Sequence, residues 1–212
     1  ATRRADAWMN RQFLDPLFLG RYPEELEEIW GASTEAFAEE DFRLIQTPID
    51  FLGINYYSRS IVRDAPLSAP FRTDRVEPPL EKTTDMGWEI FPEGLTRCLL
   101  WVTSRYGEIP LYITENGAAF DDGPNTEGRV TDQRRINYFR RHLIAAHQAI
   151  EAGAPLKGYF AWSLLDNFEW AFGYAKRFGL IHVDFETQTR TLKDSALFYR
   201  EVIESGGAHL VE

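Results

Sequence analysis

The chain is poor in cysteine and has no long apolar run. One cysteine, Cys98, among 212 residues excludes an intrachain disulfide and agrees with a reducing, cytoplasmic setting. Cys98 lies in an apolar helical stretch, so we expect it in the core rather than as a reactive thiol. No apolar run approaches the roughly 20 residues that a membrane span needs, so we expect no membrane partner.

Positive charge is also scarce. The 23 Lys and Arg residues are outnumbered by 33 Asp and Glu, which gives a net charge of −10. Nucleic acids and anionic membranes favour clustered positive charge, so neither is expected as a partner. The paired arginines at 134–135 and 140–141 are expected on the solvated surface of a helix.

Sequence motifs for metal, phosphate and serine chemistry are missing. There is no HExxH, no cysteine pair, no glycine-rich phosphate loop and no GxSxG. We therefore expect no metal and no organic cofactor.

The sequence does contain one unit three times: a short apolar strand, a long loop and a helix. The expected strands are 51–57, 110–115 and 157–163, and the expected loops are 58–91, 116–131 and 164–193. The expected helices are 92–106 closed by Gly107, 132–152 closed by Gly153, and one that follows Asp194 as its N-cap. Two more helices are expected at 3–18 and 24–43, and a hairpin around 187–189.

Apolar strands that alternate with helices are typical of a parallel sheet covered by helices. The predicted fold class is therefore α/β, with functional residues at the carboxyl ends of the strands, as in (β/α)8 barrels and open α/β sheets. Three strands cannot close a barrel that needs eight. We expect a segment outside this sequence, a partner chain or self-association to complete the fold.

The end of the second strand carries the most informative residue, Glu115. A carboxylate directly after four apolar or β-favouring residues needs partners, because an unpaired buried charge costs several kcal/mol. One interpretation is a nucleophile that a neighbouring phenol keeps ionised. The alternative is a solvated glutamate before an ordinary turn at Asn116-Gly117.

The other two strand ends supply aromatic and polar side chains. Tyr57 could donate to Glu115, or it could be an aromatic residue of a buried strand. Trp162 and Trp170 could pack on the apolar face of a sugar ring, or they could be core or rim residues. Glu169 could accept hydrogen bonds from two sugar hydroxyls, or it could be a surface charge. Together these residues favour a carbohydrate site.

The sequence resembles glycoside hydrolase family 1, the β-glucosidase family. Residues 112–117 (YITENG) resemble its nucleophile motif, 53–57 (GINYY) its sixth-strand motif, and 158–179 its eighth-strand signature. Asp15-Pro16 and 20–23 resemble the helix before strand six. The resemblance runs over nearly the whole chain. It implies that 1–212 is the C-terminal part of a single (β/α)8 barrel domain, with strands six to eight and a preceding helix.

The resemblance also implies roles for the candidate residues. Glu115 would be the nucleophile, Tyr57 its hydrogen-bond partner, and Trp162 the platform beneath the sugar.

The remaining candidates would surround the same sugar. Glu169 would bind its 4- and 6-hydroxyls and Trp170 its 3-hydroxyl, while Asn55 would help to shape the pocket. Trp88 would line the aglycone side. A glutamate at position 169 also implies an unphosphorylated sugar.

One family motif is absent. The family's acid/base glutamate lies in an Asn-Glu-Pro motif at the end of strand four, and this sequence contains no Asn-Glu-Pro. The implied activity is retaining hydrolysis of β-D-glucosides, with galactosides or fucosides as further substrates, but the chain alone is expected to be nearly inactive. The alternatives are an inactive fragment that self-associates or binds its other half, and a module that only binds sugars.

Overall fold

A computed structural model describes residues 1–31 and 38–210 of the chain. The chain divides into two compact units, one made of residues 1–50 and 60–77 and the other of residues 51–59 and 78–212. Each unit is described by itself. Within the described ranges, no helix is long and apolar enough to cross a membrane.

The smaller unit consists of short helices and one hairpin. Its elements are α1 (Thr2–Asp6), the π-helical turn η1 (Ala7–Arg11), α2 (Gln12–Leu19), α3 (Glu24–Trp30), α4 (Glu39–Ile45), β2 (Val62–Asp64) and β3 (Thr73–Arg75). The predicted helix over 3–18 is present as the continuous run from α1 to α2. Arg4 ties this run to the hairpin, because its Nε donates to the carbonyl of Phe71 at 2.9 Å.

Two predictions that concern elements of the smaller unit are wrong in part. A single helix over 24–43 does not form, because α3 ends at Trp30 and Gly31 adopts φ 55°, outside the helical region. Residues 32–37 of that predicted helix lie outside the described residues. The region 58–91 is also not all loop, since β2 and β3 pair in it as an antiparallel hairpin.

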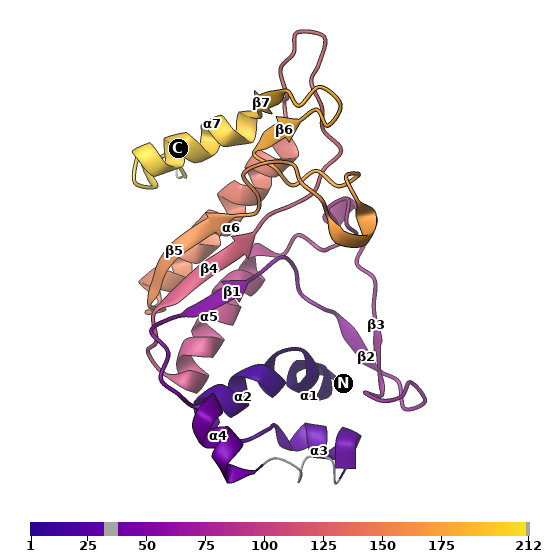
Figure 1. The fold of residues 1–212 in the computed structure, drawn as a ribbon, viewed down its shortest axis with the longest axis vertical. Coiled ribbons are helices and arrows are strands. Elements are labelled where there is room, and N and C mark those ends of the chain that lie inside the picture. The colour runs from indigo at the N-terminus through magenta and orange to yellow at the C-terminus, as the bar shows by residue number, and fades with distance from the viewer. Residues whose placement is uncertain (32–37, 211–212) are drawn as a thin grey trace. The chain divides into compact units, whose positions relative to one another are not determined.

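The larger unit contains the predicted parallel sheet. Strands β1 (Leu52–Asn55), β4 (Leu111–Asn116) and β5 (Leu156–Ala161) lie in the order β1-β4-β5, and both pairings are parallel. Helices α5 (Pro92–Tyr106) and α6 (Gln133–Glu151) cover one face of the sheet (Figure 1). The three predicted strand–helix units are therefore present, with ends that differ by one or two residues.

The chain after β5 contains several short elements before its last helix. They are η4 (Trp170–Phe172), the hairpin of β6 (Ile181–Val183) and β7 (Arg190–Leu192), α7 (Asp194–Glu204) and η5 (Ala208–Leu210). A further short helix, η3 (Leu80–Lys82), precedes α5. The hairpin β6–β7 is the one expected around 187–189.

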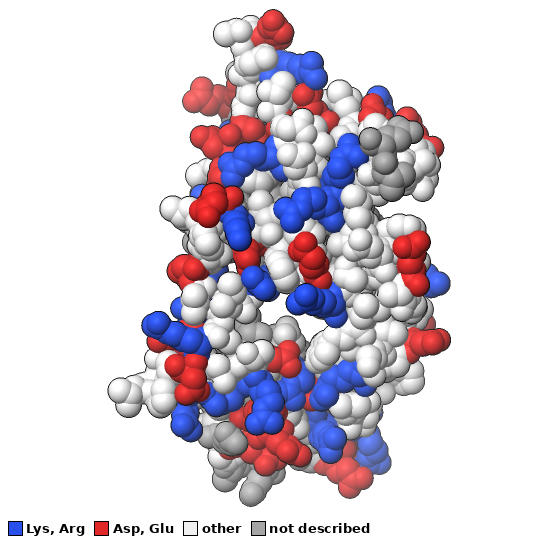
Figure 2. All heavy atoms as spheres, turned by 180° about the vertical axis from the view of Figure 1, so that it is seen from behind, with Lys and Arg blue, Asp and Glu red and all other residues white. Residues whose placement is uncertain are grey.

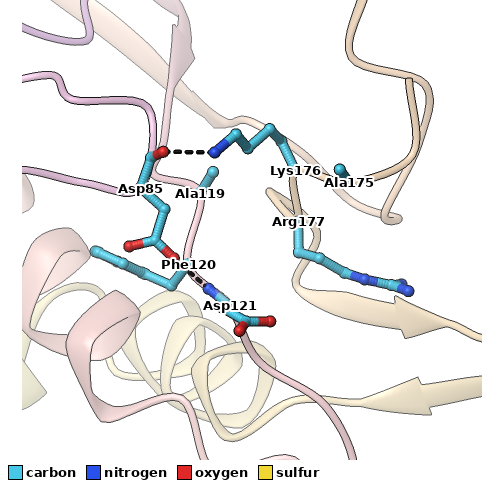
Figure 3. Close-up of a pocket in the computed structure, with 7 residues that line it drawn as sticks. All are labelled: Asp85, Ala119, Phe120, Asp121, Ala175, Lys176 and Arg177. Carbon is cyan, nitrogen blue, oxygen red and sulfur yellow. Dashed lines mark hydrogen bonds between the residues drawn. The ribbon is translucent and has the colours of Figure 1, made fainter. Parts of the chain in front are cut away.

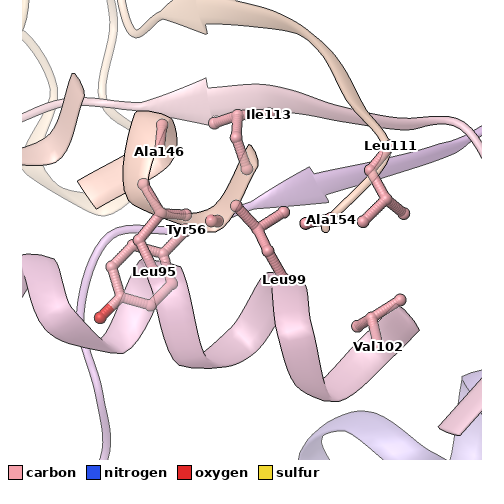
Figure 4. Close-up of a cluster of buried hydrophobic side chains, with 9 residues drawn as sticks. Tyr56, Leu95, Leu99, Val102, Leu111, Ile113, Ala146 and Ala154 are labelled. Carbon is pink, nitrogen blue, oxygen red and sulfur yellow. The ribbon is translucent and has the colours of Figure 1, made fainter. Parts of the chain in front are cut away.

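Helix α5 shows how the apolar spacing builds the core. Leu95, Leu99 and Val102 lie on one face because they are four and three residues apart, and all three are buried. They pack on Leu111 and Ile113 of β4 (Figure 4). Cys98 lies partly buried against the same cluster, as predicted.

The opposite face of the sheet is much more open. In β4 the alternate residues Tyr112 and Thr114 point away from the helices. Near them, the side chains of Phe51 and Phe160 are 53% and 57% exposed. Large apolar side chains on an exposed sheet face are typical of a surface that another layer covers.

Charges are distributed in two different ways. On the face shown in Figure 2, basic and acidic side chains are interspersed over the surface. A second set of charged side chains is buried or partly buried, and we name it the buried ion cluster. Its members are Asp122, Asp132, Arg135, Asp166, Arg177 and Lys193.

The expectation that Arg135 is a solvated surface residue is wrong. Its side chain is fully buried, and its guanidinium contacts Asp122 and donates to Asp132 at 2.5 Å. Lys193 is equally buried and bonds Asp122 at 2.6 Å and Asp166 at 3.1 Å. Arg135 and Lys193 therefore each have two carboxylate partners, which offset their loss of hydration.

The predicted N-cap of the last helix is also wrong. Asp194 is the first residue of α7 rather than its cap, and its carboxylate pairs with Arg129 at 2.9 and 3.0 Å. The backbone N–H of Ser195 is bonded instead by Asp132 at 2.8 Å. A carboxylate from the start of α6 thus takes the place of a local cap.

The adjacent residues Arg134 and Arg135 allow a matched test of the cluster. We expect Arg135→Met to lower the free energy of unfolding by about 3–5 kcal/mol, because it leaves Asp122 and Asp132 buried without their cation. Arg134→Met removes a 61% exposed side chain paired with Asp85 and should cost less than about 1 kcal/mol. Urea denaturation measures the free energy of unfolding of both variants. Equal losses in the two would contradict the stabilising role of Arg135 in the buried ion cluster.

The core also contains a buried histidine, His142 of α6. Its ring stacks on Tyr138 with centroids 3.9 Å apart, and its Nδ1 lies 2.8 Å from the carbonyl of Tyr138. Its Nε2 is buried without a hydrogen-bond partner among the described atoms. Burial lowers the pKa of His142 to about 4, so the ring is neutral in the folded protein at pH 7.

This low pKa predicts a loss of stability in acid. The unfolded chain binds a proton at His142 near pH 6.5, and the folded chain does so only near pH 4. The free energy of unfolding should therefore fall by roughly 3 kcal/mol between pH 7 and pH 4 through this residue. His142→Leu should remove that part of the pH dependence in urea titrations, whereas His147→Leu, at a 63% exposed position, should keep it.

Candidate active site

The carboxyl ends of the three strands bring the candidate residues together. Glu115 lies near the end of the central strand β4, with Asn55 of β1 as its register partner. The carbonyl of Glu115 accepts from the N–H of Tyr56 at 2.9 Å. On the other side, the N–H of Trp162 donates to the carbonyl of Asn116, also at 2.9 Å. Glu115 is thus flanked by the segments that carry Tyr57 and Trp162.

Tyr57 contacts Glu115 directly. Its hydroxyl donates to Oε2 of Glu115 at 2.6 Å, and both residues are half-buried. Burial, and next the hydrogen bond to Glu115, raise the pKa of Tyr57 far above its usual range. The phenol therefore keeps its proton and remains the donor. Glu115 is therefore held by the segment that follows β1 and does not lie free in a solvated turn.

Aromatic rings stand behind this pair. The ring of Trp88 lies 5.2 Å from that of Tyr57 at an angle of 61°. Phe178, which is buried, lies 6.2 Å from Tyr57 and 6.1 Å from Trp88. The structure thus brings Trp88 to the site. The sequence analysis missed Phe178, which lies inside the eighth-strand signature but is not a polar or strand-end residue.

Glu169 belongs to the same electrostatic environment as Glu115. It is half-buried, and burial first, then the negative charge of Glu115, raise its pKa. Its neighbour Trp170 is 80% exposed, so most of the indole faces solvent in this structure. The loop after β5 therefore presents one carboxylate to Glu115 and one uncovered aromatic ring to the outside.

Asn55 and Trp162 take up less direct positions. The side-chain carbonyl of Asn55 accepts from the hydroxyl of Thr114 at 2.7 Å, and Asn55 itself is exposed on the open face of the sheet. Trp162 is half-buried, and its backbone rather than its ring makes the hydrogen bond to β4.

A buried amide beside Glu115 was not singled out from the sequence. Asn116 is fully buried, and its Nδ2 donates to the carbonyl of Tyr56 at 2.6 Å and to the hydroxyl of Tyr138 at 3.0 Å. Its Oδ1 accepts from the hydroxyl of Tyr159. The Asn-Gly pair suggested a turn from sequence alone, but β4 continues through Asn116.

Gly117 lets two backbones come unusually close. A Cβ atom at this position would lie 1.8 Å from the carbonyl oxygen of Trp162, a separation that atoms cannot adopt. Any side chain at position 117 must therefore displace the segment that carries Trp162.

A cavity of about 300 Å³ lies away from Glu115. It is lined by Asp85, Ala119, Phe120, Asp121, Ala175, Lys176 and Arg177 (Figure 3). The ammonium of Lys176 donates to the backbone carbonyl of Asp85 at 2.6 Å, and Arg177 turns away to Asp166 of the buried ion cluster. None of the sugar-site candidates lines this cavity, so its size says nothing about the site at Glu115.

Metal ligands are not clustered in the part of the chain that the structure describes. In residues 1–31 and 38–210, no three His, Cys, Asp or Glu side chains gather in a way that could hold a metal ion. The groups that the site offers are carboxylates, a phenol, an amide and indoles. This is a set that hydrogen-bonds and packs on a small polar molecule.

The chain belongs to glycosyl hydrolase family 1, whose sequence profile matches residues 1–208. It is 49% identical to β-glucosidase A of Thermotoga maritima, over 92% of this chain and 43% of that protein. It is 45% identical to a bifunctional β-D-glucosidase/β-D-fucosidase of Bifidobacterium breve, over 98% of this chain and 49% of that protein. The family predicted from the motifs is therefore confirmed.

The fold agrees with solved members of the family. The structure of the T. maritima β-glucosidase in complex with castanospermine superposes with a TM-score of 0.92 at 46% identity, over 98% of this chain and 46% of that chain. A second structure of that enzyme, in complex with noeuromycin, gives a TM-score of 0.91. The chain thus spans about half the length of the relatives that it matches.

The close approach at Gly117 gives a prediction. Gly117→Ala should lower the free energy of unfolding by about 1–3 kcal/mol and change the near-ultraviolet signal of the tryptophans, because the Cβ must push the Trp162 backbone away. Gly123→Ala is the matched control, since a Cβ there meets no atom within 4 Å. If both variants denature at the same urea concentration, the contact at Gly117 is not tight in solution.

Proposed function

We propose that this chain supplies the nucleophile and part of the sugar pocket of a retaining β-glycosidase that hydrolyses unphosphorylated β-D-glucosides. The observation that carries the proposal is Glu115 at the end of β4, bonded by the Tyr57 hydroxyl at 2.6 Å. Membership of glycosyl hydrolase family 1 and relatives named β-glucosidases support it.

In the proposed reaction, Glu115 attacks the anomeric carbon and forms a covalent glycosyl-enzyme. A second carboxylic acid, about 5–5.5 Å away in retaining enzymes, protonates the leaving oxygen. The same group then takes a proton from water, and the hydroxide replaces Glu115 at that carbon. Because Tyr57 bonds Oε2, the other oxygen of Glu115 is free to attack.

The neighbouring side chains divide the remaining tasks. We assign Trp162 to the platform under the ring, with Glu169 and Trp170 as ligands of the sugar hydroxyls. The 80% exposed ring of Trp170 is available for such a contact. Asn55 lies on the open face beside Thr114 and would shape the same pocket. Trp88, 5.2 Å from the ring of Tyr57, would line the aglycone side.

The second carboxylic acid comes from outside this sequence. We propose that residues 1–212 form the C-terminal part of a (β/α)8 barrel domain and that β1, β4 and β5 are its strands six to eight. The exposed phenylalanines 51 and 160 on the open sheet face, and the match to about half of each solved relative, support this arrangement. The N-terminal part of the barrel would cover that face and deliver the acid/base. Cytoplasmic location stays a prediction from the single cysteine.

One alternative follows from the same open face. A fragment without the acid/base could pair with itself or with the other half of a barrel and act as a catalytically inactive scaffold. The glycosidase and the scaffold differ in one measurable way. Only the glycosidase predicts turnover when this chain is mixed with the other half of the barrel.

The experiment uses an aryl β-glucoside whose leaving group needs no protonation. We expect little turnover by the chain alone and sustained turnover when it is mixed with the N-terminal half of a family relative. A burst of one equivalent from the chain alone would show that Glu115 attacks unaided. A folded complex that never releases the aryl group would favour the scaffold.

Glu115→Gln tests the nucleophile directly. The complemented activity should fall at least about a thousandfold, because an amide cannot form the glycosyl-enzyme. Glu108→Gln is the matched control, since Glu108 is exposed and precedes the opposite end of β4. Native mass spectrometry should show that both variants still bind the other half. Activity that survives in Glu115→Gln would end the assignment.

A further inference from the structure

The polypeptide next to Glu115 is not held by a regular sheet ladder. The β1–β4 register shifts between Ile54 and Asn55, and the β4–β5 register shifts between Ile113 and Asn116. Backbone pairing therefore becomes irregular on both sides of the residue whose position matters most. Another interaction must fix the end of β4.

The amide of Asn116 provides that interaction. Both of its N–H bonds are used, one by the carbonyl of Tyr56 in β1's extension and one by the hydroxyl of Tyr138 in α6. Its oxygen is used by the hydroxyl of Tyr159 in β5. A rotated amide would turn its oxygen towards the carbonyl of Tyr56, so only one orientation satisfies all three partners. One side chain thus joins four elements at the site.

We propose that Tyr138 and Tyr159, acting through Asn116, are positioning residues that hold Glu115 against Tyr57. The catalytic part of this inference rests on the proposed role of Glu115 as nucleophile.

Tyr138 reaches both members of the catalytic pair. Its hydroxyl accepts from Asn116, which directly follows Glu115, and lies 3.4 Å from the carbonyl of Tyr57, to which it donates. A single hydroxyl therefore connects the backbones that carry the carboxylate and the phenol.

The surroundings make this connection stiff. Tyr138 is 1% exposed and Asn116 is fully buried, so water does not compete for their hydrogen bonds. His142 stacks on the ring of Tyr138 with centroids 3.9 Å apart, which fixes the plane of that ring. Losing either tyrosine hydroxyl would leave a buried amide group without its partner.

The first measurement needs no glycosidase activity. The chain is labelled with ¹³C at Cζ of tyrosine, and the exchange of the Tyr57 hydroxyl proton is followed through the deuterium isotope shift. Tyr57→Phe assigns the signal. We expect this exchange to be about tenfold faster in Tyr138→Phe, because the 2.6 Å bond to Glu115 opens more often when its two backbones are no longer joined.

Tyr199→Phe is the matched control. Tyr199 is also a partly buried tyrosine whose hydroxyl donates to a backbone carbonyl, that of Tyr159 at 3.3 Å, but it does not contact Asn116. Exchange at Tyr57 should stay at the wild-type rate in this variant. If Tyr138→Phe fails to fold, Tyr159→Phe carries the same expectation, because it removes the third partner of the amide. Folded variants with unchanged exchange would overturn the proposal.

The second measurement uses the complemented enzyme. In Tyr138→Phe, kcat should fall about tenfold with KM nearly unchanged. The reason is that the Glu115 carboxylate is less well oriented for attack, whereas the sugar contacts are not altered. In a Tyr57→Phe background the same change should have little further effect. Suppose that hydroxyl exchange at Tyr57 is faster in Tyr138→Phe but that the complemented wild-type enzyme shows no turnover. The glycosidase proposal would then be wrong, and the inference that Tyr138 positions Tyr57 would stand. An additive loss in the double variant would show that Tyr138 acts elsewhere.

Discussion

The larger unit depends on ion pairs between buried side chains of opposite charge. Three cations and three carboxylates, the buried ion cluster, join the loop after β4 and the loop after β5 to the first turns of α6 and α7. Burial lowers the pKa of Lys193, while Asp166 and Asp122 act in the opposite direction. Such groups are costly to bury singly and tolerable only as a set. Because Lys193 pairs with Asp122 of the loop after β4 and with Asp166 of the loop after β5, it joins these two loops at the start of α7.

The features that could be predicted from the sequence are those that local signals specify. Helix α5 was predicted over its full length because Pro92, the spaced leucines and Gly107 are local signals. The parallel strands followed from continuous apolar runs, and Glu115 stood out because a charge ends such a run. Glu115 and Tyr57 were both named, and the structure brings them into contact.

Most partners of the features that were missed lie far away in the chain. Arg135 looks like a surface residue beside Arg134, and only Asp122 and the fold show that it is buried. Asp194 has the chemistry of an N-cap, but Asp132, 62 residues earlier, takes that task. Asn116 looks like a turn residue until Tyr138 and Tyr159 are placed around it. Local sequence patterns cannot report such pairings.

The close approach of Gly117 to the carbonyl of Trp162 leaves no room for a side chain between the segments that carry Glu115 and Trp162. A close contact between main chains does not change when neighbouring side chains are replaced. In the proposed glycosidase, replacing side chains in the loop that carries Glu169 and Trp170 would change the sugar contacts without changing this spacing of the main chain. The choice of sugar would thus depend on loop side chains, and the position of the proposed nucleophile on the main chain at the same strand ends.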